Sequence, residues 1–234
     1  MDGTELAARF SYVTNSLRFC GPEEASHQFV DYIKSRNDPK KVQDSLRKFE
    51  GLYPYLSAIA EKTGGNFFDY DVVESYWIGN KLLESFDDND MKRIIQKLMQ
   101  RGLPKSIGKE LIERLPIGLM PHHNFNVYYV GVGRTTGSVE FTLSNMDNCR
   151  ISYGKVVDVL NDKLIVTTRP LKKEQNKLFL GEEETRTAVF MKEMLPDIKK
   201  NDFVALHWGF APLVLTDAQV KNLEKYNKKI LEIL

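Results

Sequence analysis

The chain of 234 residues has few cysteines, no excess charge and no long apolar run. Its two cysteines, Cys20 and Cys149, cannot form a disulfide framework or the four-ligand zinc spacing, which favours a reducing compartment. The 33 basic and 32 acidic side chains nearly cancel, so no global field draws the chain to nucleic acid or to anionic lipid. No stretch reaches the roughly 18 apolar residues of a membrane span, and no signal-peptide pattern opens the chain. We therefore expect a cytoplasmic protein that recognises its partners locally.

The first half of the chain has the pattern of amphipathic helices. From residue 4 to about 115, apolar residues recur every three or four positions. Helix-start and helix-end signals divide this pattern, such as Asp38-Pro39 at a start and Gly64-Gly65 at an end. We expect six or seven short helices, packed as a compact helical domain over residues 1–118.

The second half, residues 119–234, has the pattern of β-strands. Six short runs rich in β-branched and aromatic residues predict strands over 124–130, 138–143, 150–159, 163–168, 185–191 and 202–207. Strands this short and evenly spaced predict a small OB-like β-barrel. Thr216-Asp-Ala-Gln219 has the form of a capping box and predicts a closing helix over 216–233. The expected fold class is α+β, with an all-α domain followed by a barrel and a C-terminal helix.

The chain offers four histidines as candidate ligands or catalytic groups. His27 lies within a predicted helix among polar neighbours and is interpreted as a surface residue. His122 and His123 enter a predicted strand and are candidate metal ligands, although adjacent residues of a strand face opposite ways and only one can reach a given site. His207 ends the last predicted strand, where a core histidine bonded to backbone is the alternative to a functional one.

No motif of a self-contained enzyme is present. Gly131-Val-Gly-Arg-Thr-Thr-Gly137 resembles a phosphate-binding loop, but a strand is predicted after it where such a loop needs a helix. We interpret it as a hairpin turn. Nucleophile-elbow and zinc-protease motifs are absent, and the chain is not predicted to be an enzyme.

Cys149 lies at the start of a predicted strand and has two interpretations. It can be a small apolar residue that fills the end of the barrel. Alternatively, Arg150 and Lys155 can lower its pKa and favour the thiolate, which is the form that binds metal. The residue types alone leave both open.

Two motifs in residues 148–234 resemble the HypC/HupF family of hydrogenase maturation chaperones. The first is Cys149-Arg-Ile-Ser-Tyr-Gly-Lys-Val156, which matches that family's cysteine and its Gly-Lys-Val at the same spacing. The second is Leu195-Pro-Asp-Ile-Lys-Lys-Asn-Asp-Phe-Val-Ala-Leu-His-Trp-Gly-Phe-Ala211, a charged turn and then the strand motif, followed by a terminal helix as in that family. The family's cysteine stands at the start of its chain, whereas Cys149 follows 148 residues, and the helical half has no counterpart there.

The resemblance implies an accessory role in the maturation of nickel–iron hydrogenase. It implies that Cys149 and His207 hold iron that carries cyanide and carbon monoxide ligands, transiently, and that Gly154 and Lys155 belong to the binding motif. A thiolate and an imidazole suit such iron. The implied partners are proteins: the hydrogenase large subunit and a HypD-like scaffold, with neither nucleic acid nor membrane.

Three alternatives stay open. The barrel can be a protein-interaction module that no longer handles iron. It can be an OB-type nucleic-acid-binding module with stacking aromatics (Tyr128, Tyr129, Phe141 and Tyr153) and phosphate-binding lysines (Lys172, Lys173 and Lys177). It can be a metal-dependent enzyme built on His122, His123 and Cys149 at the junction of the two halves.

Overall fold

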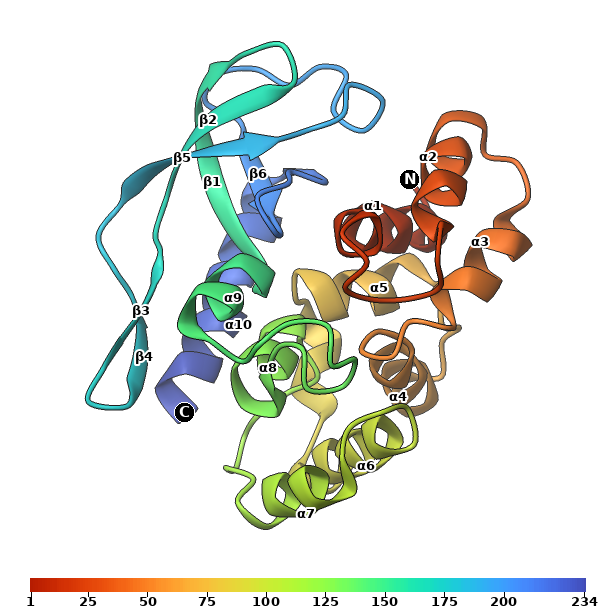
Figure 1. Ribbon diagram of the computed structural model, residues 1–234, viewed down its shortest axis with the longest axis vertical. Helices are drawn as coiled ribbons and strands as arrows, with labels where there is room; N and C mark the ends of the chain where they lie inside the picture. Colours follow the sequence, from red (N-terminus) through yellow and green to blue (C-terminus); the bar gives the residue numbers. More distant parts are fainter.

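The first half of the chain folds into helices, as its periodicity predicts. The computed structural model describes all of residues 1–234, and its helical half lies on one side of the molecule (Figure 1). Seven α-helices and one 3-10 helix follow one another: α1 (Gly3–Ser16), α2 (Ala25–Ser35), α3 (Pro39–Leu46), α4 (Tyr53–Thr63), α5 (Tyr70–Trp77), η1 (Lys81–Ser85), α6 (Asp88–Met99) and α7 (Lys105–Glu113).

Local capping chemistry sets several helix ends. The Asp38 carboxylate accepts a hydrogen bond from the Lys41 backbone N–H at 3.1 Å, and Pro39 occupies the first turn of α3. At the end of α4, Gly64 takes φ +74°, a left-handed conformation that glycine adopts without strain. These were the signals read from the sequence, and both are confirmed.

The first part of the second half is helical, and the strands predicted there are wrong. It holds α8 (His123–Phe125), the π-helix η2 (Asn126–Gly131) and α9 (Leu143–Cys149). The predicted strand 124–130 reflected burial rather than β-structure, because short apolar runs do not distinguish a buried helix from a strand. The predicted strand 138–143 pairs with nothing, and its Thr142 instead caps α9 by accepting from the Asn145 N–H. The loop of residues 131–137 is accordingly no hairpin turn.

The rest of the second half folds into strands and a final helix: β1 (Ser152–Val159), β2 (Lys163–Thr168), β3 (Leu171–Glu174), β4 (Lys177–Leu180), β5 (Glu184–Val189), β6 (Phe203–Leu206), β7 (Val214–Leu215) and α10 (Asp217–Ile233). The four remaining predicted strands are confirmed, and so are α10 and its capping box between Thr216 and Gln219. The hairpin β3–β4 was not predicted.

The sheet is open, so the expected closed barrel is wrong. Its order is β5-β2-β1-β6-β7 with antiparallel neighbours, while β3 and β4 form a separate hairpin. The edge strand β5 approaches the other side through two backbone bonds of Val189, to Gly209 O and from Ala211 N, each 2.8 Å. These bonds curl the sheet but form no ladder that closes it, because the loop that follows β6 makes the contact in place of a strand.

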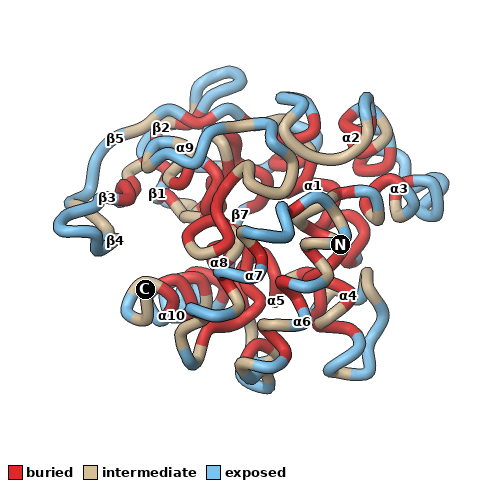
Figure 2. The backbone as a smooth tube through the Cα atoms, turned by 60° about the horizontal axis from the view of Figure 1, so that its bottom comes forward, coloured by how far each residue is buried: buried red, intermediate tan, exposed pale blue.

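The helices and the sheet share one buried core. A single cluster of 58 buried apolar residues extends from Leu6 to Ile230, and Figure 2 shows buried backbone running through both halves. Arg9 of α1 reinforces the junction by donating to the carbonyls of Met194 (2.7 Å) and Pro212 (3.3 Å). The division into domains at residues 118 and 119 stays a prediction. None of the helices combines the length and apolarity needed to cross a bilayer.

Candidate metal centre

Three side chains from distant parts of the sequence meet where the helices adjoin the sheet. One ligand atom from each of His123, Cys149 and His207 lies within 4.8 Å of the other two. All three residues are buried, with exposed fractions of 6%, 9% and 1%. One thiol and two imidazoles form a donor set that suits a first-row transition-metal ion.

Each of these residues lies at the end of a secondary-structure element. His123 is the first residue of α8, whose N-cap is His122. Cys149 is the last residue of α9, shortly before β1. His207 follows the end of β6, immediately before Trp208, which takes φ +50° in the tight turn. The site therefore depends on tertiary packing of three elements.

The ring of His207 has a fixed tautomer. Its Nδ1 lies 3.1 Å from the backbone carbonyl oxygen of Phe10 in α1, and a carbonyl only accepts, so Nδ1 carries the proton. The other ring nitrogen, Nε2, is buried and has no hydrogen-bond partner. A neutral ring therefore presents an unshared electron pair to the cluster.

The ring of His123 lies between a tyrosine and the cysteine. Its Nδ1 is 3.0 Å from the hydroxyl of Tyr76 in α5, and that hydroxyl donates its only proton to the carbonyl of Gly51 at 2.8 Å. Tyr76 can therefore only accept at Nδ1. The Nε2 atom lies 2.9 Å from the Cys149 carbonyl oxygen and 3.7 Å from its sulfur. A neutral ring has one proton too few to donate at both nitrogens.

Burial keeps all three groups neutral when no metal is bound. It lowers the pKa of His207 to about 4 and the pKa of His123 well below its ordinary value. Burial also raises the pKa of the Cys149 thiol, while the Trp208 indole N–H acts in the opposite direction. The interpretation in which Arg150 and Lys155 lower this pKa is therefore not supported, because the Arg150 guanidinium is held by Asp147 and the Arg169 carbonyl. A thiolate at Cys149 needs a cation as its partner.

Aromatic rings pack around the imidazoles. The Trp77 ring lies 4.6 Å from His123 and 5.5 Å from His207 between centroids, and the two imidazoles are 5.2 Å apart. Such packing holds the side chains in place, and a small cavity adjoins them. That cavity, of about 60 Å³, is bordered by the three cluster residues, by Cys20 and by part of the loop 131–139.

The other predicted site residues lie outside the cluster. The buried His122 uses Nδ1 to accept from the Asn124 backbone N–H at 3.0 Å, which is a capping role. Gly154 and Lys155 lie within β1 and border neither this cavity nor the cluster. At Gly154 a Cβ atom would come within 2.9 Å of Val166, so the glycine allows close packing of β1 on β2. His27 is exposed on α2, as predicted.

The aromatic residues of the nucleic-acid alternative do not form one exposed platform. Tyr128 is buried and donates to Asn227 at 2.9 Å, and Tyr129 donates to the Leu111 carbonyl at 2.6 Å. Phe141 is exposed and lies under the Arg134 guanidinium. Lys172, Lys173 and Lys177 are exposed along the hairpin β3–β4.

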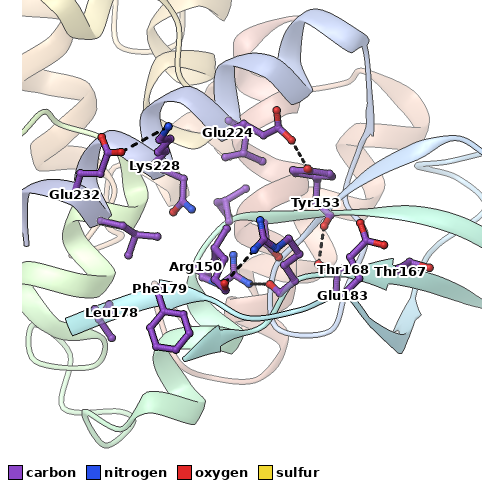
Figure 3. A pocket seen from close by; sticks show the side chains of 17 residues that line it. Arg150, Tyr153, Thr167, Thr168, Leu178, Phe179, Glu183, Glu224, Lys228 and Glu232 are labelled. Atoms are coloured by element: carbon purple, nitrogen blue, oxygen red, sulfur yellow. Dashed lines mark hydrogen bonds and ion pairs between the residues drawn. The ribbon is translucent and has the colours of Figure 1, made fainter. Parts of the chain in front are cut away.

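A larger cavity of about 460 Å³ lies apart from the cluster, between α10 and the strands (Figure 3). Tyr153 on β1 hydrogen-bonds there to Glu224 of α10, and Thr168 donates to the Tyr153 carbonyl at 2.6 Å. The walls carry charges of both signs, including Arg169, Glu183 and Lys228. No histidine or cysteine borders this cavity, so it is no part of the metal-ligand set.

A model of a family of unknown function, DUF6390, matches residues 1–234. The chain belongs to this family. Because the match covers every residue, the helical half and the sheet of this DUF6390 protein form one family unit, with the three-residue cluster at their junction. No curated protein and no solved structure matches the chain.

Proposed function

We propose that this protein is a metal-handling accessory protein in metalloenzyme assembly, with nickel–iron hydrogenase as the system that its HypC/HupF resemblance implies. The observation that carries the proposal is the meeting of Cys149 and His207. The two residues come from separate motifs of the resemblance, and their ligand atoms lie within 4.8 Å of each other in a buried cluster.

The chemistry of this pair supports transfer rather than catalysis. A thiolate and an imidazole bind iron, and an incomplete ligand set leaves positions for cyanide, carbon monoxide or a partner's donor. The iron with its ligands is cargo, received from a HypD-like scaffold and delivered to the large subunit. In this proposal the curled sheet and α10 do what the OB-like barrel and terminal helix do in the HypC/HupF family: they support the cargo ligands Cys149 and His207.

Infrared spectroscopy tests this function. The protein is co-expressed with hydrogenase maturation proteins, purified, and examined for the bands of iron-bound carbon monoxide and cyanide. We expect bands in the wild type that disappear in Cys149→Ala and His207→Ala. The matched controls are Cys20→Ala, which removes the other thiol, and His27→Ala on the exposed face of α2.

Two results would contradict the proposal: no bands in the wild type under these conditions, or bands unchanged in both cluster variants. Loss of the bands together with retained binding to the large subunit would identify Cys149 and His207 as cargo ligands. Binding to the large subunit without bands in any variant would instead support the interaction module.

A further inference from the structure

No positive charge lies on the side of the cluster where the Nε2 atoms of both histidines face the Cys149 sulfur. The His207 Nε2 atom has no partner, and the His123 Nε2 atom faces the carbonyl oxygen and the sulfur of Cys149. When Nδ1 is protonated on both rings, both Nε2 atoms carry lone pairs that can bind a cation, whereas in the apo-protein the Cys149 carbonyl competes for a proton on His123 Nε2. The unpartnered Nε2 of His207 and the acceptor left without a proton beside His123 cost free energy in the apo-protein, which favours binding of a cation.

The two imidazoles are oriented from outside the cluster by groups of the helical half. The Phe10 carbonyl in α1 accepts from His207 Nδ1–H, and the Tyr76 hydroxyl in α5 lies 3.0 Å from His123 Nδ1, where it accepts from Nδ1–H when Nε2 binds a cation. Metal-binding histidines commonly donate their second ring N–H to such a partner, which fixes the tautomer and the ring orientation. Both rings thus present Nε2 to the same space.

The distances fit a metal ion after a small contraction. Bonds of about 2.0–2.3 Å to nitrogen and sulfur place tetrahedral ligand atoms about 3.3–3.8 Å apart. The Cys149 sulfur and His123 Nε2 are 3.7 Å apart, while the whole set lies within 4.8 Å. Closing the set therefore requires movements of about 1 Å, a scale that side-chain rotation can supply.

We infer that His123 is the third protein ligand of a divalent transition-metal ion of the zinc, cobalt or iron(II) class, bound together with Cys149 and His207, and that Tyr76 positions its ring. The helical half thus completes within one chain a ligand set that Cys149 and His207 leave incomplete. At least one further position faces the cavity bordered by Cys20, where an exogenous ligand can bind. The role of this site in metalloenzyme assembly rests on the proposed function, but the binding of an ion by these three residues does not.

Cobalt(II) titration of the purified full-length, metal-free protein tests the inference. We expect one ion per chain, a thiolate-to-cobalt charge-transfer band, the visible bands of four-coordinate cobalt, and displacement by zinc. Cys149→Ser should abolish the charge-transfer band, whereas Cys20→Ser should keep it. His123→Gln should lower the affinity by at least about 100-fold, since even positioning residues commonly account for about 10- to 100-fold.

Matched variants separate ligation from packing. His122→Asn keeps a capping acceptor beside His123 and should bind cobalt as the wild type does. Tyr76→Phe should weaken binding by about 10- to 100-fold and shift the visible bands. Its control, Tyr55→Phe, removes another buried hydroxyl, which donates to Asn126 and not to a histidine, and should leave the spectrum unchanged.

Nitrogen-15 NMR of the histidines in the zinc complex uses the wild-type protein alone, so its result does not depend on whether any variant folds. Two rings bound through Nε2 with Nδ1 protonated are expected, and a single bound ring would overturn the inference. Unchanged cobalt affinity and spectrum in His123→Gln would also overturn it, while leaving iron handling by Cys149 and His207 intact. Conversely, a cobalt site with three protein ligands in a protein that never shows the infrared bands would contradict the proposed function and support the three-ligand site.

Discussion

The metal-free protein should lose stability on mild acidification, because its buried histidines are neutral. Burial lowers the pKa of both His122 and His207 from 6.5 to about 4. Unfolding exposes these rings, which then take up protons below their ordinary pKa. The stabilising difference is fully present above about pH 6.5 and is lost progressively as the pH falls toward about 4.

The size of the loss follows from proton linkage. At about pH 5 an unfolded histidine is almost fully protonated and the buried one is about one-tenth protonated, which costs about 2 kcal/mol per residue. His122 and His207 together should lower the free energy of unfolding by about 4 kcal/mol between about pH 7 and pH 5. The pKa of His123 is also lowered, which acts in the same direction. Most carboxylates remain ionised over this interval, so the histidines dominate the change.

Urea unfolding, followed by circular dichroism in the presence of a chelator, measures this loss. His207→Asn keeps a donor for the Phe10 carbonyl, and His122→Asn keeps a helix cap, so each removes mainly the titrating ring. Each variant should recover about 2 kcal/mol of the acid-induced loss. The exposed His27→Asn should recover none. An equal acid-induced loss of stability in the wild type, His122→Asn and His207→Asn would refute the reasoning.

Three further substitutions test the packing around the site by equilibrium unfolding. Gly154→Ala should cost about 1–3 kcal/mol, because its Cβ would lie 2.9 Å from Val166; a cost below that of an ordinary strand substitution would count against close packing. Arg9→Ala should cost about 3–5 kcal/mol, since it removes the bonds to the sheet side and a charge partner of the fully buried Glu5. Thr216→Ala should cost about 1 kcal/mol by removing the α10 cap, and Thr216→Ser should restore most of it.

The parts of the fold that sequence reasoning predicted correctly have local causes. The capping box at Thr216, the proline in the first turn of α3 and the alternating runs of β1 and β2 each act within a few residues. The missed hairpin β3–β4 also had a local signal, since Gln175 and Asn176 both take positive φ in its two-residue turn. Asparagine tolerates that conformation, but the charged, exposed strands beside it carry no apolar alternation.

The strand predicted over residues 124–130 was wrong for a different reason. Its aromatic and β-branched residues match a strand, yet Phe125 and Val130 are both completely buried in a helical setting. An apolar composition indicates that a segment is buried, but it does not indicate whether the buried backbone is a helix or a strand. The π-helix there also changes side-chain directions relative to a regular helix, a feature that recurs at functional sites. His123 was thus a candidate from its residue type alone, with no pattern that directed it toward Cys149.

The orienting groups of the centre lie further beyond sequence reasoning, because one of them is not a side chain. The Phe10 carbonyl belongs to the interior of α1 and also serves that helix, so no residue type at position 10 marks its bond to His207. In the sequence Tyr76 has the pattern of an apolar position of α5, and only its contact with Gly51 makes its hydroxyl an acceptor for His123 Nδ1. The motif pair Cys149 and His207 is therefore visible in the sequence, whereas the geometry that makes two imidazoles converge on one sulfur is supplied by the helices. Metal affinity should accordingly belong to the whole chain, since a sheet without α1 and α5 would keep the thiol and one histidine but neither of the bonds that fix the rings.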